Sequence, residues 1–332
     1  MFKSHIMKKR SVIFSGLIIF VLATMFSCDA GEKEKNKKPN IIYILADDLG
    51  IGDLSFLGQE KFSTPNIDRL AEEGMHFVQH YSGSTVCAPS RSTLLTGQHT
   101  GYTPIRGNKQ WGYLLNWPMP DETVTIAEVL KENGYATACY GKWGLGFDEM
   151  SSANDQGFDE FYGFYNQRVA HHYYPYYIWH NEEKIYFEEN EEDKEGLYVP
   201  EYMQDRLLEF IERKKDSSFF IYYANIIPHA ELFAPEEYME KFRGKLLPEV
   251  SYEGTDYGDE RFREGPYGSQ PEAHAAFAAM VTYLDDQVGE IYEKLKELGL
   301  DDNTMIIFTS DNGPHKEGGA DPDYFNSNGP YR

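Results

Sequence analysis

The chain has 332 residues, of which 41% are hydrophobic and 26% charged, with a formal net charge of −23. This length is enough for one large α/β domain or two small ones. A protein that binds a nucleic-acid backbone needs a basic face, so the acidic balance argues against nucleic acid as a partner.

The N-terminus has the layout of a secretory signal. Basic residues at 8–10 precede the apolar run VIFSGLIIFVLATMF, and Cys28 follows almost directly. The run is too short and too poorly flanked to predict a membrane span. A cysteine at this place resembles a bacterial lipoprotein signal, in which Cys28 becomes the lipidated first residue. We therefore expect a signal at 1–28, a polar linker at 29–37, and a protein exported to the cell envelope, in the periplasm or at the outer membrane. Plain secretion and an uncleaved anchor stay open.

Apolar runs of strand length alternate with helical patterns through the rest of the chain, and this alternation predicts an α/β fold with a mostly parallel sheet flanked by helices. Residues 143–210 are aromatic and irregular and predict an inserted loop region. The acidic run NEEDKEGLYVPEY at 190–202 predicts a solvated loop or hairpin, with an acidic cation site as the alternative. Apolar periodicity predicts strands at 40–48, 136–142, 217–229 and 303–313, and helices at 123–135 and 273–300.

Polar side chains follow these strands where each one ends. Open parallel sheets place their sites beyond the carboxyl ends of the strands, so we expect these groups to converge on one crevice. Three carboxylates and an amide oxygen among them are hard ligands, which suit calcium or magnesium better than zinc. The strand-end groups are Asp47, Asp48, Lys142, His229, Asp311 and Asn312.

The stretch CAPSRSTLLTG at 87–97 predicts a short helix that begins at Cys87 or just after it and stops at Gly97. A group at that N-terminus faces unpaired backbone N–H donors and the positive end of the helix dipole, which favours an anionic ligand. By itself the pattern also fits a buried thiol beside a helix cap.

Five segments together resemble the formylglycine-dependent type I sulfatase family. CAPSRSTLLTG resembles the first sulfatase signature and GYATACYGKWGLG the second, and PNIIYILADDLG, NIIPHA and SDNGPHKEGG match in family order and spacing. The resemblance extends over residues 38–332. It implies an alkaline-phosphatase-like fold and an enzyme that hydrolyses sulfate esters.

The resemblance also implies a role for each strand-end group. A separate maturase would oxidise Cys87 to formylglycine, whose hydrate attacks sulfur with one hydroxyl and expels sulfate with the other. Arg91, one helical turn on, would hold the hydrate. Lys142 and His229 would bind the sulfate oxygens, and His229 or another acid would protonate the leaving alcohol. The implied calcium ligands are Asp47, Asp48, Asp311, Asn312 and the modified Cys87.

Two features depart from the family pattern. Many members carry a histidine two places after the signature lysine, where this chain has Gly144. His171, His172 and His315 are substitutes by proximity, and structural or substrate-contacting roles stay open for them. Family members also continue to a further lysine and a smaller C-terminal domain, so we expect 38–332 to be the N-terminal portion of a truncated catalytic domain.

The expected substrate is a sulfated glycan. The aromatic segment AHHYYPYYIWHN at 170–181 supplies rings that can stack on sugar faces, although the same rings also fit a packed loop core. Two other functions stay open. A phosphatase or phosphonate hydrolase of the same fold would share the metal-binding strand ends, but phosphatases usually carry serine or threonine in place of Cys87 and more zinc ligands. A non-catalytic glycan-binding lipoprotein derived from a sulfatase would fit Gly144 and the missing lysine.

Overall fold

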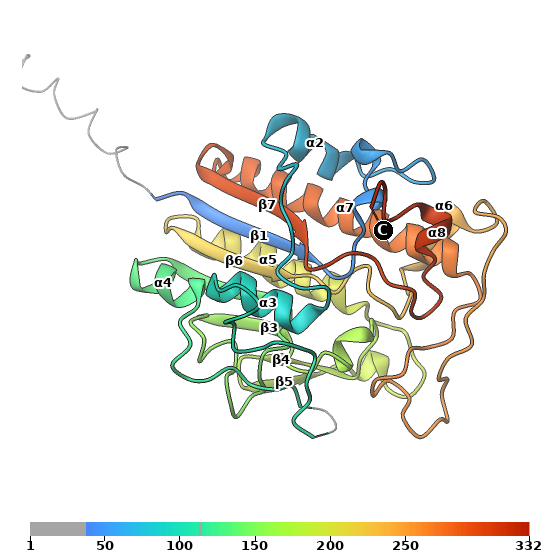
Figure 1. The fold of residues 1–332 in the computed structure, drawn as a ribbon, viewed down its shortest axis with the longest axis horizontal. Helices are drawn as coiled ribbons and strands as arrows, with labels where there is room; N and C mark the ends of the chain where they lie inside the picture. The colour runs from blue at the N-terminus through green and yellow to red at the C-terminus, as the bar shows by residue number, and fades with distance from the viewer. Residues whose placement is uncertain (1–37, 113–114, 332) are drawn as a thin grey trace, which may run out of the picture. The chain divides into compact units, whose positions relative to one another are not determined.

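A seven-stranded sheet lies at the centre of the described chain (Figure 1). The computed structural model describes residues 38–112 and 115–331, so the expected signal, Cys28 and the linker lie outside the described residues. The strands are β1 (Asn40–Ala46), β2 (Ala136–Lys142), β3 (Glu160–Phe164), β4 (Tyr177–His180), β5 (Glu183–Tyr186), β6 (Phe219–Ala224) and β7 (Thr304–Ser310). The helices are α2 (Pro65–Glu73), α3 (Cys87–Thr96), α4 (Ile126–Glu132), α5 (Val199–Lys214), α6 (Glu236–Phe242), α7 (Ala273–Glu297) and α8 (Pro322–Phe325).

The sheet is mostly parallel and has the order β5-β4-β3-β2-β6-β1-β7. β1 pairs in parallel with β6 and β7, and β2 pairs in parallel with β6 and β3. The two antiparallel pairings, of β3 with β4 and of β4 with β5, lie at one edge, and β4 is the strand that runs opposite to the others. The predicted α/β fold with a mostly parallel sheet is therefore confirmed.

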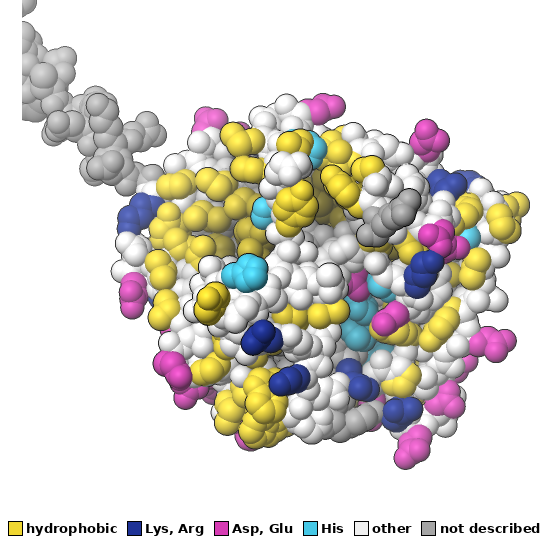
Figure 2. Space-filling model, in the orientation of Figure 1, with side chains coloured by type: hydrophobic (Ala, Val, Ile, Leu, Met, Phe, Trp, Pro, Cys, Tyr) yellow, Lys and Arg dark blue, Asp and Glu magenta, His cyan; other side chains and the backbone are white. Residues whose placement is uncertain are grey.

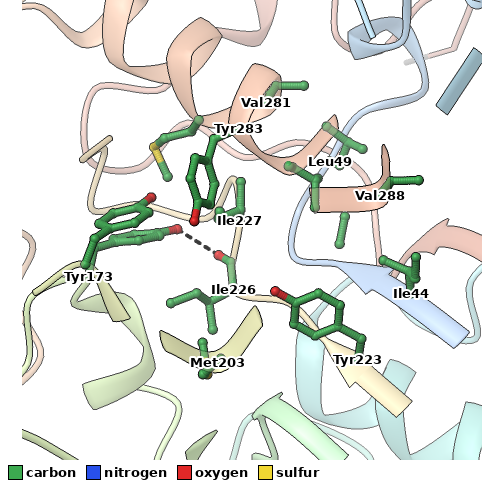
Figure 3. Packing of buried hydrophobic residues seen from close by; sticks show 14 of the residues in the cluster. Ile44, Leu49, Tyr173, Met203, Tyr223, Ile226, Ile227, Val281, Tyr283 and Val288 are labelled. Atoms are coloured by element: carbon green, nitrogen blue, oxygen red, sulfur yellow. Dashed lines mark hydrogen bonds between the residues drawn. The ribbon is translucent and has the colours of Figure 1, made fainter. Parts of the chain in front are cut away.

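Helices pack on both faces of the sheet because side chains of successive strand residues point to opposite sides. On one face, Ile44 and Tyr223 pack in a buried cluster with α5 and α7 residues such as Met203 and Val288 (Figure 3). On the other face, Leu45 joins a second cluster with residues of α3 and α4. Both faces of the central strands are thus covered by packed side chains, which explains their near-continuous apolar sequences.

The expectation of an irregular region at 143–210 was wrong. This stretch holds the strands β3, β4 and β5 and most of α5. The strands are only four or five residues long, too short for a clear alternation of apolar and polar residues. Their place in the sheet is fixed by successive pairing, β3 with β2, β4 with β3 and β5 with β4. The acidic run at 190–202 is an exposed loop over residues 191–196, as expected, and α5 begins at Val199. The hairpin of β4 and β5 precedes this run.

No helix among the described residues is both long and apolar enough to span a membrane. Cys87 and Cys139, the two cysteines within the described residues, are both free thiols and both buried. Cys139 lies in β2, whereas Cys87 is the first residue of α3.

Gly141 lets β2 approach β6 one residue before the strand ends at Lys142. Its φ is +105°, and a Cβ built there would lie 2.0 Å from the carbonyl oxygen of Ala224 on β6. Gly163 of β3 pairs with Gly141 in register, and a Cβ built at Gly163 would lie 1.9 Å from the Gly141 carbonyl oxygen. The glycine pair therefore sets the position of Lys142 relative to β6.

We expect Gly141→Ala to lower the free energy of unfolding by about 3 kcal/mol or more, because it combines an unfavourable φ with a backbone clash. Gly58→Ala is the matched control: its φ is +110°, but an added Cβ meets nothing within 4 Å. That variant should lose only about 1 kcal/mol. Urea unfolding of both variants measures the difference, and equal losses would contradict the proposed close approach.

Candidate active site

Four strands end at the same edge of the sheet and bring the predicted strand-end groups together. Asp47 and Asp48 directly follow β1, and Lys142 is the last residue of β2. His229 lies in the loop after β6, and Asp311 and Asn312 directly follow β7. Because β1 lies between β6 and β7, and β2 lies beside β6, all four loops open on one crevice.

Lys142 joins Asp47 to Cys87 in the interior. Its Nζ donates to Asp47 Oδ2 at 2.7 Å and lies 3.3 Å from Cys87 Sγ. The side chains of Lys142 and Asp47 are fully buried. Burial alone would lower the pKa of Lys142, but the carboxylate of Asp47 holds that pKa above its usual range. Burial would likewise raise the pKa of Asp47, yet Lys142, Arg91 and His229 together hold it well below its usual range. Both groups are therefore charged.

Arg91 binds Asp311, a second buried carboxylate beside Asp47. Its Nε and Nη2 donate to Asp311 Oδ2 at 3.0 and 2.8 Å, and its Nη1 donates to the Lys142 carbonyl at 2.8 Å. Nη2 also lies 3.3 Å from Asp47 Oδ1. Arg91 is completely buried, one turn into α3, which ends at Gly97 with a left-handed φ of +64° as expected. In this structure Arg91 holds the carboxylates, rather than facing the cavity described below.

His229 lies between two other imidazoles beside Asp48. Its Nε2 is 3.2 Å from Asp48 Oδ2, and its Nδ1 donates to the carbonyl of Ala230 at 2.6 Å, which fixes its tautomer. The rings of His171 and His315 stack on it at centroid distances of 4.2 and 4.9 Å. Burial, with His229 nearby, lowers the pKa of His315 to about 4, so this ring is neutral near pH 7.

His172 lies away from this stack, despite the sequence-based expectation of a substrate contact. It is 1% exposed, and its Nδ1 donates to Glu231 Oε2 at 3.0 Å while its Nε2 accepts from the Gly265 N–H at 3.1 Å. Glu231 Oε2 also accepts from the Gly268 N–H at 2.9 Å. The pair therefore holds the segment that carries Tyr267, whose ring lies 5.3 Å from that of His171.

A cavity of about 470 Å³ opens above these groups. Cys87, Asp48, His229 and Asn312 line it, while its walls come from loops after β3, β7 and α3 and from the segment before α7. Figure 2 shows histidine side chains gathered in a hollow of this face, with lysine and arginine side chains around it. Sequence reasoning missed several wall residues, because nothing in their local sequence marks them: Lys109, Gln110, Gln167, Arg168 and Tyr267.

The inner end of the cavity suits a divalent cation. Asp47, Asp48, Cys87 and His229 offer ligand atoms that all lie within 4.8 Å of one another. Asp47 Oδ1 and Asn312 Oδ1 are buried oxygens without a hydrogen-bond donor. Buried polar atoms normally have a partner, and a cation would supply one to both oxygens. Asp48 adds a carboxylate that contacts neither Lys142 nor Arg91 in an ion pair, and its Oδ2 lies 3.2 Å from His229 Nε2.

Asp311 is placed differently from the expected ligand. Its Oδ2 accepts both Arg91 hydrogen bonds and its Oδ1 accepts from the Asp48 N–H at 3.1 Å, and it is not part of the four-residue group. His229, expected to bind sulfate, has a ring nitrogen within 4.8 Å of the ligand atoms of this group, and its sulfate-binding role stays a prediction. Carboxylate and amide oxygens still dominate the donor set, which agrees with a hard cation.

The space that a side chain at Gly144 would need is taken by Gln167. A Cβ at Gly144 would lie 3.0 Å from Gln167 Cγ, and the φ of Gly144 is +73°. Gln167 lines the cavity and comes from the loop after β3. A side chain at 144 would therefore require Gln167 to move, and Gln167 itself offers an amide but no titratable group at this place.

With this geometry established, comparison with known proteins identifies the family. The sulfatase family model matches residues 39–331, so the chain belongs to the sulfatase family. N-acetylgalactosamine-6-sulfatase of Rattus norvegicus is 31% identical over 338 residues, covering 95% of this chain and 56% of the relative. Arylsulfatase of Klebsiella aerogenes is 28% identical over 333 residues, covering 87% and 69%. The chain thus spans a little over half the length of most curated relatives it matches.

Solved structures confirm the alkaline-phosphatase-like fold. The crystal structure of Ps i-CgsB aligns with a TM-score of 0.68 and 29% identity, covering 86% of this chain and 61% of that one. Phosphonate monoester hydrolase of Agrobacterium radiobacter aligns with a TM-score of 0.55 at 19% identity, a likeness of fold alone.

We expect His172→Ala to loosen the segment around Tyr267, because Glu231 loses a donor and the Gly265 N–H loses its acceptor. Amide hydrogen exchange at Gly265 and Gly268 should accelerate, and the free energy of unfolding should fall by about 1–3 kcal/mol. His172→Gln can still donate and accept, so it should be milder. His180→Ala, on β4, is the control and should leave hydrogen exchange at both glycines unchanged. Unaltered exchange in His172→Ala would show that His172 and Glu231 do not hold this segment.

Proposed function

We propose that this protein hydrolyses sulfate esters of carbohydrates. The observation that carries the proposal is Cys87, the signature residue, at the N-terminus of α3, 3.3 Å from the buried ammonium of Lys142 and in the same cavity as Asp48 and His229. An N–H-rich helix end and a buried cation are what a sulfate needs. The relatives named for action on sulfated sugars support the choice of substrate, as does a crystal structure of Ps i-CgsB in complex with k-i-k-neocarrahexaose, 29% identical to this chain.

The nucleophile is formylglycine made from Cys87. Burial, reinforced by Asp47 and Asp311, raises the pKa of the Cys87 thiol well above its usual range despite Lys142, so the unmodified thiol is a poor nucleophile. Conversion replaces the CH₂–SH group by CH=O, a two-electron oxidation with water as the oxygen source and sulfide as the leaving group in the formal balance, for which a separate maturase supplies the oxidant. A hydrated aldehyde has two hydroxyls on one carbon, so one can attack sulfur and the other can then expel sulfate.

The surrounding side chains orient the ester and balance its charge. Lys142 is the cation that faces the sulfate oxygens, since its Nζ is beside Sγ. Arg91 positions Asp47 and Asp311 and neutralises part of their charge. His229 keeps its Nδ1 proton on the Ala230 carbonyl, so its Nε2 is the nitrogen directed to Asp48 and the cavity. His229 is the residue placed to protonate the leaving alcohol.

Calcium is the cation proposed for the inner end of the cavity. Asp47, Asp48, Asn312 and the oxygen that replaces Sγ of Cys87 would hold it, and Asp311 would complete the set if its carboxylate is shared with Arg91. When bound, a divalent cation lowers the pKa of an oxygen nucleophile and offsets sulfate charge.

We further propose that the protein is exported and attached to the membrane by a lipid on Cys28, which would place it beside extracellular glycans. Two rival functions differ from this proposal in the reaction expected of them. A phosphonate hydrolase of this fold would turn over phosphonate esters faster than sulfate esters, and a non-catalytic glycan-binding protein would bind sulfated sugars without turnover.

The conversion of Cys87 to formylglycine can be tested with Cys139 as a control in the same chain. When the native protein is produced with a maturase, mass spectrometry should show the peptide containing Cys87 with sulfur and two hydrogens lost and one oxygen gained, together with its hydrate. Cys139 is equally buried but lies in a strand without the signature, so its peptide should keep the thiol. An active preparation in which Cys87 is wholly a thiol would refute the proposed nucleophile.

The metal has a readout independent of turnover. Chelation should lower the unfolding temperature, and calcium should restore it, because a ligand at 100 times its dissociation constant adds about 2.7 kcal/mol to stability. Asp47→Asn should abolish this calcium dependence by removing a charged ligand. Asp53→Asn, which changes a buried carboxylate hydrogen-bonded to Ser327 outside the site, should keep it. A calcium response that survives in Asp47→Asn would contradict the ligand assignment.

A further inference from the structure

The cavity that holds Cys87 carries two cations that the proposed chemistry does not use, Lys109 and Arg168. They come from neighbouring segments of the wall. Gln110, next to Lys109, accepts hydrogen bonds from Arg168 Nε and Nη2 at 2.5 and 3.1 Å when its amide oxygen faces the guanidinium. Lys109 Nζ lies 5.6 Å from the ring centre of Trp117. Neither cation belongs to the buried group around Asp47.

Asn166 and Gly265 fix the position of Arg168. Its backbone N–H donates to Asn166 Oδ1 at 2.7 Å, which fixes the turn after β3. Gly265 leaves room for its side chain, because a Cβ at Gly265 would lie 3.2 Å from Arg168 Cδ. A larger residue at 265 would push the guanidinium aside. The wall is thus shaped around this arginine.

The anionic groups of the same walls have other partners. Asp48 contacts His229 and Asn312 at the inner end. Glu317 accepts from the Tyr267 hydroxyl. The chain as a whole carries a charge of −23, so a polyanionic sugar would be repelled by most of the surface. Lys109 and Arg168 therefore place positive charge in the cavity of an otherwise acidic protein, and this charge favours a negatively charged ligand.

We propose, on the basis of the function proposed above, that Lys109 and Arg168 form a second anion subsite, which binds a negatively charged group of the sugar other than the sulfate that is removed. The cavity volume of about 470 Å³ leaves room for a sugar ring beside the scissile ester. The chemistry that fits is a carboxylate or a second sulfate, since arginine and lysine both bind these anions with charge-assisted hydrogen bonds. The preferred substrates therefore carry at least two anionic groups.

Binding can be measured without turnover by placing Cys87→Ala in every protein and working with the native chain in calcium. The probes are galactose 6-sulfate with one anion, a galactose disaccharide with two sulfates, and a uronate-containing disaccharide with one sulfate. Calorimetric titration should show that the two-anion probes bind about 10- to 100-fold more tightly than galactose 6-sulfate. The probe with the larger gain identifies sulfate or carboxylate as the second group.

Arg168→Gln should abolish this preference and Lys109→Gln should reduce it. Arg168→Lys, which keeps the charge without the fork, should retain part of it and also covers the case in which the glutamine variant fails to fold. Arg106→Gln, an exposed arginine outside the cavity, is the matched control and should bind as the parent does. Equal binding of one-anion and two-anion probes by the parent, or an equal loss for both in Arg168→Gln, would overturn the subsite.

The proposed sulfatase activity is judged separately, by turnover of 4-methylumbelliferyl sulfate by the matured protein with intact Cys87. Turnover without a two-anion preference would refute the subsite alone. A two-anion preference without turnover would refute the activity and leave the subsite standing.

Discussion

The buried ion pairs of Lys142 with Asp47 and of Arg91 with Asp311 hold the site together. All four side chains are fully buried, so none can exchange its partner for water. Removing one member of such a set leaves an uncompensated charge and typically costs about 3–5 kcal/mol. The network also links four segments of the chain, because its members come from the ends of β1, β2 and β7 and from α3. Cys87 is positioned by contact with it.

The network explains how an acidic chain can attract an anion at one place. Its two cations are balanced by carboxylates, and the divalent cation proposed above would add positive charge at the inner end of the cavity. The whole-chain charge of −23 argues against nucleic-acid partners but says little about the pocket, where charge is set by a few groups in a medium of low dielectric constant.

Most of the sheet and the position of the site could be predicted from the sequence. Long apolar runs such as 40–46 and 219–224 can only be strands buried on both faces, and acidic or basic residues at their ends meet because parallel strands end together. The strands β3 to β5 could not, since their pairing depends on β2. Nor could the pairing of Asp311 with Arg91, or the support of His172 by Glu231, because both join residues far apart in the chain.

Gly144 shows how a local departure from a family pattern should be interpreted. Taken alone, a missing histidine suggests lost function. In the structure, Gln167 occupies the space beside Gly144, and the adjoining Arg168 reaches the same cavity between Gln110 and Gly265. Gln167 and Arg168 both line the cavity wall, while the buried ion pairs of Lys142 and Arg91 are complete. Under the substrate proposal above, a glycine at 144 would therefore change contacts of the wall and leave the ion pairs unchanged. Such a change fits altered substrate choice, because specificity depends on contacts that differ between substrates and catalysis on those they share.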